Sequence, residues 1–220
     1  MNNKTHPPKK KTGVQKLYSI CHAKWYDPFK RMWDKWIVSK AETELSLFFK
    51  SNLDKSKKIL ELGCGTALNL EKILSSGSKF ASYLGLDFSP DMLAIAKNKF
   101  KDNPQVTFIE KDITNLKDIN EKFDIIICTW VLSHLESPST LVNEAQNFLN
   151  KGGKMFLIFF TKPRWYINWW MFPFSRFLFK TKYLSKKEIN KFNNIKSIHH
   201  FSANIATTVF IEKPFLQQCL

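Results

Sequence analysis

The stretch KILELGCGTALNL, residues 58–70, decides how the rest of the chain is interpreted. It places Gly63 and Gly65, two of only seven glycines, between two apolar runs. This order is typical of a strand that turns sharply into a helix. Glycine at such a turn lets the backbone approach a ligand without a Cβ in the way. The stretch therefore predicts a ligand site at the carboxyl end of a strand.

The turn does not have the pattern of a dinucleotide site. Such a site has the pattern G-x-G-x-x-G, and the third glycine position is Leu68 here. Glu61, just before the first glycine, is also a poor neighbour for a pyrophosphate. A carboxylate at this place favours a ligand with a cationic group.

Apolar segments and helical patterns alternate after this turn. The predicted strands are residues 58–62, 83–86, 106–109, 123–128 and 154–160, and the predicted helices are 68–75, 90–100 and 138–149. Ser89 and Ser137 each precede a proline and are predicted helix N-caps. Gly77 and Gly152 are predicted to have positive φ. Apolar strands separated by helices indicate a parallel sheet covered on both faces.

The two ends of the chain depart from this alternation. Residues 18–49 have helical spacing, with Asp27 as the predicted cap and Pro28 at the first helical position. Residues 185–192 predict a short helix with a Ser185/Glu188 capping box, and residues 195–201 and 205–212 predict two closing strands. We expect residues 1–16 to be a disordered basic tail without a signal peptide, and no second domain.

The charge and the cysteines limit the classes of partner. The 220 residues carry a net charge of +15, which favours nucleic acid, acidic lipid or a charged small molecule without choosing among them. The four cysteines lie far apart and form no C-x-x-C pair. We therefore expect no zinc site or disulfide framework, and a reducing, cytoplasmic compartment.

Five motifs, in order, resemble those of class I S-adenosylmethionine-dependent methyltransferases of the small, type-11-like kind. They are LELGCGTA (60–67), YLGLDFSPDMLAIAK (83–97), FIEKDIT (108–114), FDIIICTWVLSHLESP (123–138) and LNKGGKMFLI (149–158). Ala67 replaces the last glycine of the family's acidic-x-Gly-x-Gly-x-Gly pattern. The resemblance implies a Rossmann-like, doubly wound α/β fold with a mostly parallel seven-stranded sheet and an antiparallel C-terminal strand. It also implies one domain over residues 17–220, with N-terminal lid helices at about 17–50.

The resemblance implies S-adenosyl-L-methionine as the cofactor. Asp87 would hold both ribose hydroxyls, Asp112 would bond the adenine amino group, and Ile113 would pack on the ring. The implied cofactor-binding residues are Glu61, Gly63, Cys64, Gly65, Asp87, Phe88, Asp112, Ile113 and Thr129. Taken singly, Asp87 could also be a plain turn residue and Cys64 a small buried side chain.

The sequence names no certain catalytic base. Methyl transfer from a sulfonium is an in-line displacement, so the protein mainly aligns the nucleophile with the methyl group. A base is needed only when the nucleophile arrives protonated. His134 after the fourth strand is the first candidate and Tyr26 the second. The alternative for His134 is a role in packing or hydrogen bonding.

An aromatic segment, WYINWWMFPFSRFLF at residues 165–179, lies inside an expected insertion at about 161–184. It is shorter than the roughly 20 residues of a membrane span. It either caps the substrate cavity or, with its flanking lysines, contacts an anionic membrane peripherally on its inner face. The second interpretation favours a hydrophobic or lipid-like acceptor, such as an aminophospholipid head group or a quinone precursor.

Three alternative functions stay open. They are a soluble small-molecule N- or O-methyltransferase, an RNA methyltransferase, and a non-catalytic lipid- or partner-binding protein on the same fold. The letters CTWV at residues 128–131 replace the Asn-Pro-Pro-Tyr type of tetrad, which argues against an adenine or cytosine amino group as substrate. Other RNA positions are compatible with the sequence.

Overall fold

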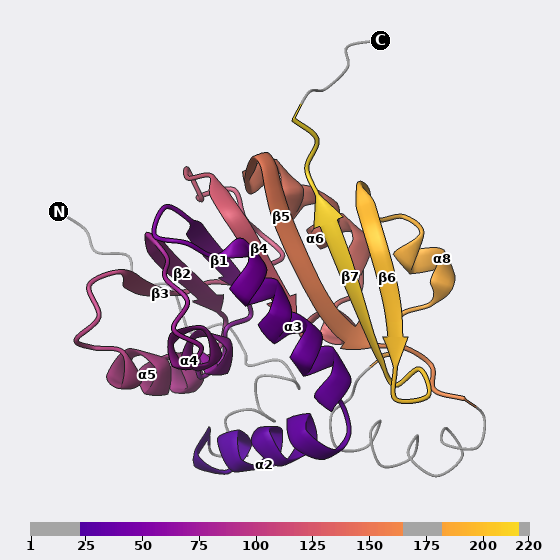
Figure 1. Ribbon diagram of the computed structural model, residues 1–220, viewed down its shortest axis with the longest axis horizontal. Coiled ribbons are helices and arrows are strands. Elements are labelled where there is room, and N and C mark those ends of the chain that lie inside the picture. Colours follow the sequence, from indigo (N-terminus) through magenta and orange to yellow (C-terminus); the bar gives the residue numbers. More distant parts are fainter. Residues whose placement is uncertain (1–22, 165–181, 216–220) are drawn as a thin grey trace, which may run out of the picture.

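The computed structural model describes residues 23–164 and 182–215, and the described part is built around one sheet. Seven strands of these residues lie in the order β3-β2-β1-β4-β5-β7-β6 (Figure 1). Their bounds are β1 (Lys58–Leu62), β2 (Ser82–Asp87), β3 (Val106–Glu110), β4 (Phe123–Thr129), β5 (Leu149–Phe160), β6 (Ile195–Phe201) and β7 (Ala206–Glu212). Neighbouring strands are parallel except that β7 is antiparallel to both β5 and β6. The predicted fold class is therefore confirmed.

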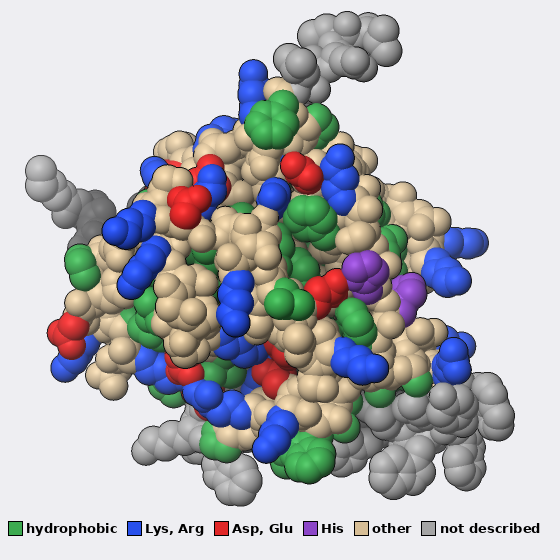
Figure 2. Space-filling model, in the orientation of Figure 1, with side chains coloured by type: hydrophobic (Ala, Val, Ile, Leu, Met, Phe, Trp, Pro, Cys, Tyr) green, Lys and Arg blue, Asp and Glu red, His purple; other side chains and the backbone are tan. Residues whose placement is uncertain are grey.

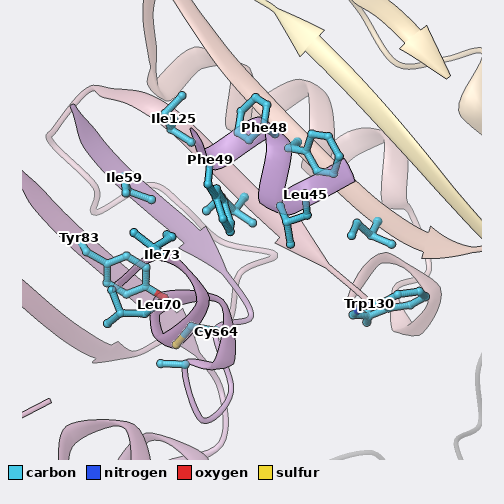
Figure 3. Packing of buried hydrophobic residues seen from close by; sticks show 14 of the residues in the cluster. Leu45, Phe48, Phe49, Ile59, Cys64, Leu70, Ile73, Tyr83, Ile125 and Trp130 are labelled. Atoms are coloured by element: carbon cyan, nitrogen blue, oxygen red, sulfur yellow. The ribbon is translucent and has the colours of Figure 1, made fainter. Parts of the chain in front are cut away.

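Helices cover both faces of the sheet. They are α2 (Ala23–Trp36), α3 (Ser39–Asn52), α4 (Leu68–Ser75), α5 (Pro90–Lys99), α6 (Pro138–Ala145) and α8 (Lys186–Ile189), with 3₁₀ turns η1 (Leu132–His134) and η2 (Gln146–Phe148). The core has two layers because successive strand residues point to opposite faces. In β4, Ile125 belongs to the layer under α3 and α4, whereas Ile126 belongs to the layer under α6. Figure 3 shows Leu45, Phe48 and Phe49 of α3 beside Ile125 in the first layer.

The predicted cap of the N-terminal helix is wrong. Helix α2 already includes Ala23 and continues through Pro28, so Asp27 does not begin it. The Asp27 carboxylate instead accepts a hydrogen bond of 2.6 Å from Thr66 Oγ1 and pairs with Lys99. These contacts with the glycine turn and α5 replace the local capping bond. The helix then breaks, so the single helical stretch predicted for residues 18–49 is two helices in its described part.

Two further capping predictions have opposite outcomes. Ser89 caps α5 as predicted, because its Oγ accepts from the Met92 N–H at 3.4 Å. Ser137 makes no side-chain cap bond, and the N–H of Ser139 donates to Glu188 Oε1 at 3.1 Å instead. A carboxylate from α8 thus serves the start of α6. Gly77 and Gly152 have the predicted positive φ, but only Gly77 follows a helix end as predicted, since Gly152 lies within β5.

Two predictions on segments are not tested by this fold. The tail at residues 1–16 and the aromatic segment at residues 165–179 lie outside the described residues. Within the described ranges, no helix is both long enough and apolar enough to cross a membrane.

Candidate active site

The glycine turn joins the carboxyl end of β1 to α4 and is fastened to the neighbouring strand. The N–H groups of Gly63 and Cys64 both donate to the Leu86 carbonyl of β2, at 2.8 and 2.9 Å. Gly63, Gly65 and Ala67 all have positive φ, at 76°, 53° and 63°. Such a turn leaves the carboxyl end of β1 lined by backbone, next to the point between β1 and β4 where the strand order reverses and where open α/β sheets bind their ligands.

The two glycines have different surroundings. A Cβ on Gly63 would lie 2.3 Å from Val131 Cγ2, so this glycine is required by packing against the segment after β4. A Cβ on Gly65 would meet no atom within 4 Å. Gly65 therefore faces open space, where a ligand can approach the backbone.

Asp87 at the end of β2 holds the turn in shape. Its Oδ2 accepts from the Gly65 N–H at 2.8 Å, and its Oδ1 accepts from the Ser89 N–H at 2.8 Å. The side chain is buried, and this burial raises the pKa of Asp87. A carboxylate has about four acceptor positions, so Asp87 can accept a further bond from a ligand hydroxyl.

Glu61 is the buried acid of the site, with 2% of its surface exposed. Its Oε1 accepts from Asn69 Nδ2 at 2.8 Å, and its Oε2 accepts from the Tyr83 hydroxyl. Asn69 Nδ2 also donates to Thr129 Oγ1 at 2.9 Å, which ties β1, α4 and β4 together. Burial raises the pKa of Glu61 to about 7. A cationic ligand beside this carboxyl group would favour its charged form.

These residues surround a pocket of about 370 Å³, counted with its open mouth. The predicted residues that line it are Glu61, Gly63, Cys64, Gly65 and Thr129. Further lining residues that the sequence did not indicate are Lys30, Thr66, Leu68, Asn69, Lys72 and Trp130. Thr66, Leu68, Asn69 and Lys72 belong to the turn or to the first turns of the helix after it, so proximity to the glycines was an available signal. Lys30 comes from α2, and no local pattern pointed to it.

A cluster of four charged side chains fastens α2 over this pocket. Lys30 pairs with Asp34 and, at 3.3 Å, with Glu42, while Lys72 lies 3.2 Å from Asp34 and 2.6 Å from Glu42. Burial opposes the ionisation of Glu42, but the two ammonium groups prevail and lower the pKa of Glu42 to about 2. Glu42 is therefore ionised at neutral pH, whereas burial and the neighbouring Glu42 raise the pKa of Asp34. The cluster joins α2, α3 and α4.

Trp130 links this cluster to the end of β4. Its Nε1 donates to Glu42 Oε1 at 3.0 Å, and Lys30 Nζ lies 5.1 Å from its ring centroid. Trp130 has φ of 65°, a left-handed conformation that is unusual for a bulky residue. Its backbone N–H donates to Ile158 O at 2.7 Å. The indole is thus held as one wall of the pocket.

Four predicted cofactor-binding residues are outside the pocket lining: Asp87, Phe88, Asp112 and Ile113. Phe88 follows Asp87 and is half-buried, and Ile113 is buried. Asp112 is exposed, and its Oδ1 accepts from the Thr114 N–H at 2.9 Å and the Thr114 hydroxyl at 2.7 Å. Cys64 does line the pocket, and burial raises the pKa of its thiol well above the ordinary value, so it is not a reactive thiolate.

The two candidate bases are placed differently. His134 ends η1, outside the pocket lining, and burial lowers its pKa to about 4, so its imidazole is neutral at pH 7. Tyr26 is in α2, and its side chain is outside what the structure describes. In residues 23–164 and 182–215, no three His, Cys, Asp or Glu side chains are grouped so that they could hold a metal ion.

A buried acid before a Gly-x-Gly turn, with a second acid at the end of the next strand, defines an α/β protein with a cofactor site at its switch point. Residues 59–153 match the profile of a family described as a methyltransferase domain. One similar curated protein is malonyl-[acyl-carrier protein] O-methyltransferase 1 of Ilyobacter polytropus, which is 32% identical over 60% of this chain. Another is the ubiquinone biosynthesis O-methyltransferase of Coxiella burnetii, which is 30% identical over 46% of this chain. The chain spans less than half of these relatives, 47% and 43% of their length.

A similar solved structure is that of an S-adenosylmethionine-dependent methyltransferase from Clostridium acetobutylicum. It is 20% identical, its TM-score is 0.62, and the match covers 86% of this chain and 99% of that one. The profile match over residues 59–153 and the similar curated proteins support the class I S-adenosylmethionine-dependent methyltransferase family, and the solved structure shows the same fold. The residues present fit the cofactor of this family: Glu61 suits its cationic end, Gly65 leaves room for it, and Asp87 can accept from hydroxyl groups.

Proposed function

We propose that this protein transfers a methyl group from S-adenosylmethionine to a hydrophobic or lipid-like acceptor, such as a quinone precursor or an aminophospholipid head group. The observation that carries the choice of acceptor is an aromatic wall beside the pocket. Trp130 lines the pocket, and its ring centroid lies 4.8 Å from that of Phe160 at the end of β5. Trp33 of α2 meets Phe160 edge-on at 6.3 Å. Such a wall favours an apolar ring or chain over a strongly hydrated acceptor.

The names of the relatives agree with this class of acceptor. The Coxiella burnetii protein is named for ubiquinone biosynthesis, and the same name is given to a Saccharomyces cerevisiae protein that is 27% identical over 133 residues. The Ilyobacter polytropus protein is named for an acyl-carrier protein substrate. The first two names support a quinone precursor as the first acceptor to test.

The bound cofactor would supply an electrophilic methyl group on a sulfonium. The residues of this chain would then position that group and exclude water. Glu61 would hold the cationic end of the ligand, and Asp87 would accept from its hydroxyl groups. The indole of Trp130 would restrict the approach of the acceptor to the line of displacement.

The acceptor atom determines whether a base is needed, and His134 and Tyr26 stay the candidates. A neutral imidazole with a pKa of about 4 is a weak base at pH 7. We therefore assign His134 the task of accepting a hydrogen bond that orients the acceptor. We also propose that residues 17–220 form one catalytic domain in which the helices of residues 17–50 act as the lid.

The test is the fate of a labelled methyl group. The full chain is incubated with labelled cofactor and a cell extract, which is then separated into lipid, RNA and water-soluble fractions. A parallel reaction uses a polyprenylated catechol as quinone precursor, and Asp87→Ala serves as the matched cofactor-site control. We expect label in the lipid fraction that Asp87→Ala abolishes. Label in water-soluble small molecules or in RNA would replace the proposed acceptor by those classes, and cofactor binding without transfer to any fraction would favour a binding protein.

A further inference from the structure

Helix α2 separates its charges between two faces. Its only acids, Asp27 and Asp34, face the protein, where Asp27 bonds Thr66 and Asp34 pairs with Lys30 and Lys72. The exposed residues of the helix, among those whose side chains are described, are Pro28, Arg31, Met32, Lys35 and Trp36. The last four follow Pro28 by three, four, seven and eight positions, so all five lie on one side of the helix. We call this set the outer face of α2; it carries cations and apolar groups and no acid.

The apolar part of the outer face is large. Trp36 is 73% exposed and Met32 is 53% exposed, and they are one helical turn apart. Lys35 Nζ lies 5.8 Å from the Trp36 ring centroid. Arg31 pairs with Glu71, yet 62% of its side chain stays exposed. Figure 2 shows hydrophobic side chains next to lysine and arginine along the edge of the molecule where Figure 1 places α2.

This composition fits the surface of a membrane. An interfacial helix combines Trp and other apolar residues with Lys and Arg, since the apolar groups enter the boundary of the acyl chains while the cations meet anionic head groups. Each cation near an anionic leaflet adds to this attraction. A single exposed indole does not form the series of rings on which the bases of a nucleic acid strand stack.

The inner face of the same helix belongs to the cofactor site. Lys30 lines the pocket, and Asp27 bonds the hydroxyl of Thr66 in the glycine turn. The Lys30–Glu42 and Asp34–Lys72 pairs hold the helix against α3 and α4. Whatever binds the outer face is therefore separated from the pocket by about one helix diameter, roughly 10 Å.

We propose that the outer face of α2 is a docking surface for an anionic lipid bilayer. Docking through this face would place the pocket beside the membrane in which a lipid-like acceptor resides. In that respect the proposal rests on the proposed function. The binding itself requires no methyl transfer, so the two proposals can fail separately.

The test is co-sedimentation of the full chain with vesicles of phosphatidylcholine, with and without phosphatidylglycerol. Met32→Ala with Trp36→Ala removes the apolar part, and Lys35→Glu reverses one charge. Leu47→Ala and Lys50→Glu are the matched controls, because both residues are exposed on α3, away from the outer face. Thermal stability and cofactor affinity are measured for every variant, since neither should change.

We expect wild type to bind the vesicles that contain phosphatidylglycerol more tightly, and salt to weaken that binding. The double variant should lose about tenfold or more in vesicle affinity. Lys35→Glu should bind more weakly and depend less on salt, and both controls should match wild type. Equal binding of the α2 variants and wild type would overturn the proposal, because the contact would then lie elsewhere. Binding to an RNA oligonucleotide that the double variant loses, without binding to vesicles, would also overturn it.

The two proposals are separated by assaying transfer to the polyprenylated catechol in detergent micelles. A double variant that fails on vesicles but transfers normally in micelles supports docking at α2. The wild-type protein could instead bind vesicles through α2 and transfer label only to water-soluble compounds. That result would support the docking surface and refute the lipid-like acceptor.

Discussion

Replacing each glycine of the turn by alanine distinguishes the glycine that is needed for ligand approach from the one that is needed for packing. Gly65→Ala places a Cβ in open space at a φ of 53°, and Ala67 already adopts a φ of 63° in the same turn. The cost of the left-handed conformation to an alanine is about 1–2 kcal/mol. Gly63→Ala has the same conformational cost, and its Cβ also lies 2.3 Å from Val131 Cγ2. Overpacking of this kind adds about 1–3 kcal/mol, so the total for Gly63→Ala is about 2–5 kcal/mol.

The two variants are distinguished by measuring stability and binding on the same samples. Urea unfolding should give a loss of about 1–2 kcal/mol for Gly65→Ala and a larger loss for Gly63→Ala. Calorimetry with S-adenosylmethionine should show that Gly65→Ala weakens binding by about tenfold or more, which is about 1.4 kcal/mol. Gly77→Ala is the control, since it has a φ of 75° and an equally open Cβ position but does not line the pocket.

The reasoning has two points at which it can fail. If Gly65→Ala binds the cofactor as wild type does, no ligand approaches this turn, and the site is misplaced. If Gly63→Ala and Gly77→Ala lose the same stability, the predicted collision with Val131 is relieved without cost, and the packing argument is wrong.

Three further predictions concern the acids and the histidine. Asp87→Ala should weaken cofactor binding by about 1.5–3 kcal/mol in calorimetry, because the Gly65 and Ser89 N–H groups lose their acceptors. Cofactor affinity should rise from about pH 6 to pH 8, because a cationic ligand favours the ionised form of Glu61, whose pKa is about 7. Binding should release a proton, and Glu61→Gln should remove the pH dependence. If His134 orients the acceptor, His134→Ala should lower turnover about 10²-fold at unchanged cofactor affinity, whereas an effect below about threefold would return it to packing. Since the pKa of His134 falls from 6.5 to about 4 on folding, its contribution to stability should be complete above about pH 6.5 and be lost as the pH falls toward 4, and acid titration of unfolding in His134→Ala should lack this component.

The elements were predictable where short-range chemistry sets their ends. The first strand was predicted at residues 58–62 and is observed at Lys58–Leu62, because the apolar run ends at Gly63. Ser89 caps α5 through a bond that spans three positions. Helix α6 begins at Pro138 as predicted, but its cap was not predicted, since the Ser139 N–H donates to Glu188, which comes from a distant part of the chain.

For the site, the sequence alone determined the residues at the ends of β1, β2 and β4. Glu61, Gly65 and Thr129 meet because parallel neighbouring strands end at the same edge of a sheet, and that edge follows from the alternation of strands and helices. The resemblance to the methyltransferase family, and the cofactor that it implies, came from the five sequence motifs.

Only the tertiary structure decided which side chains close the pocket. Lys30 reaches it because ion pairs hold α2 against its neighbours: Lys30 pairs with Glu42 of α3, and Asp34 pairs with Lys72 of α4. Ion pairs of this kind form between residues that the sequence keeps far apart, and their free energy depends on the partners and on the water that folding removes. The same reason explains Asp27, which resembles a local helix cap in the sequence and instead bonds the glycine turn.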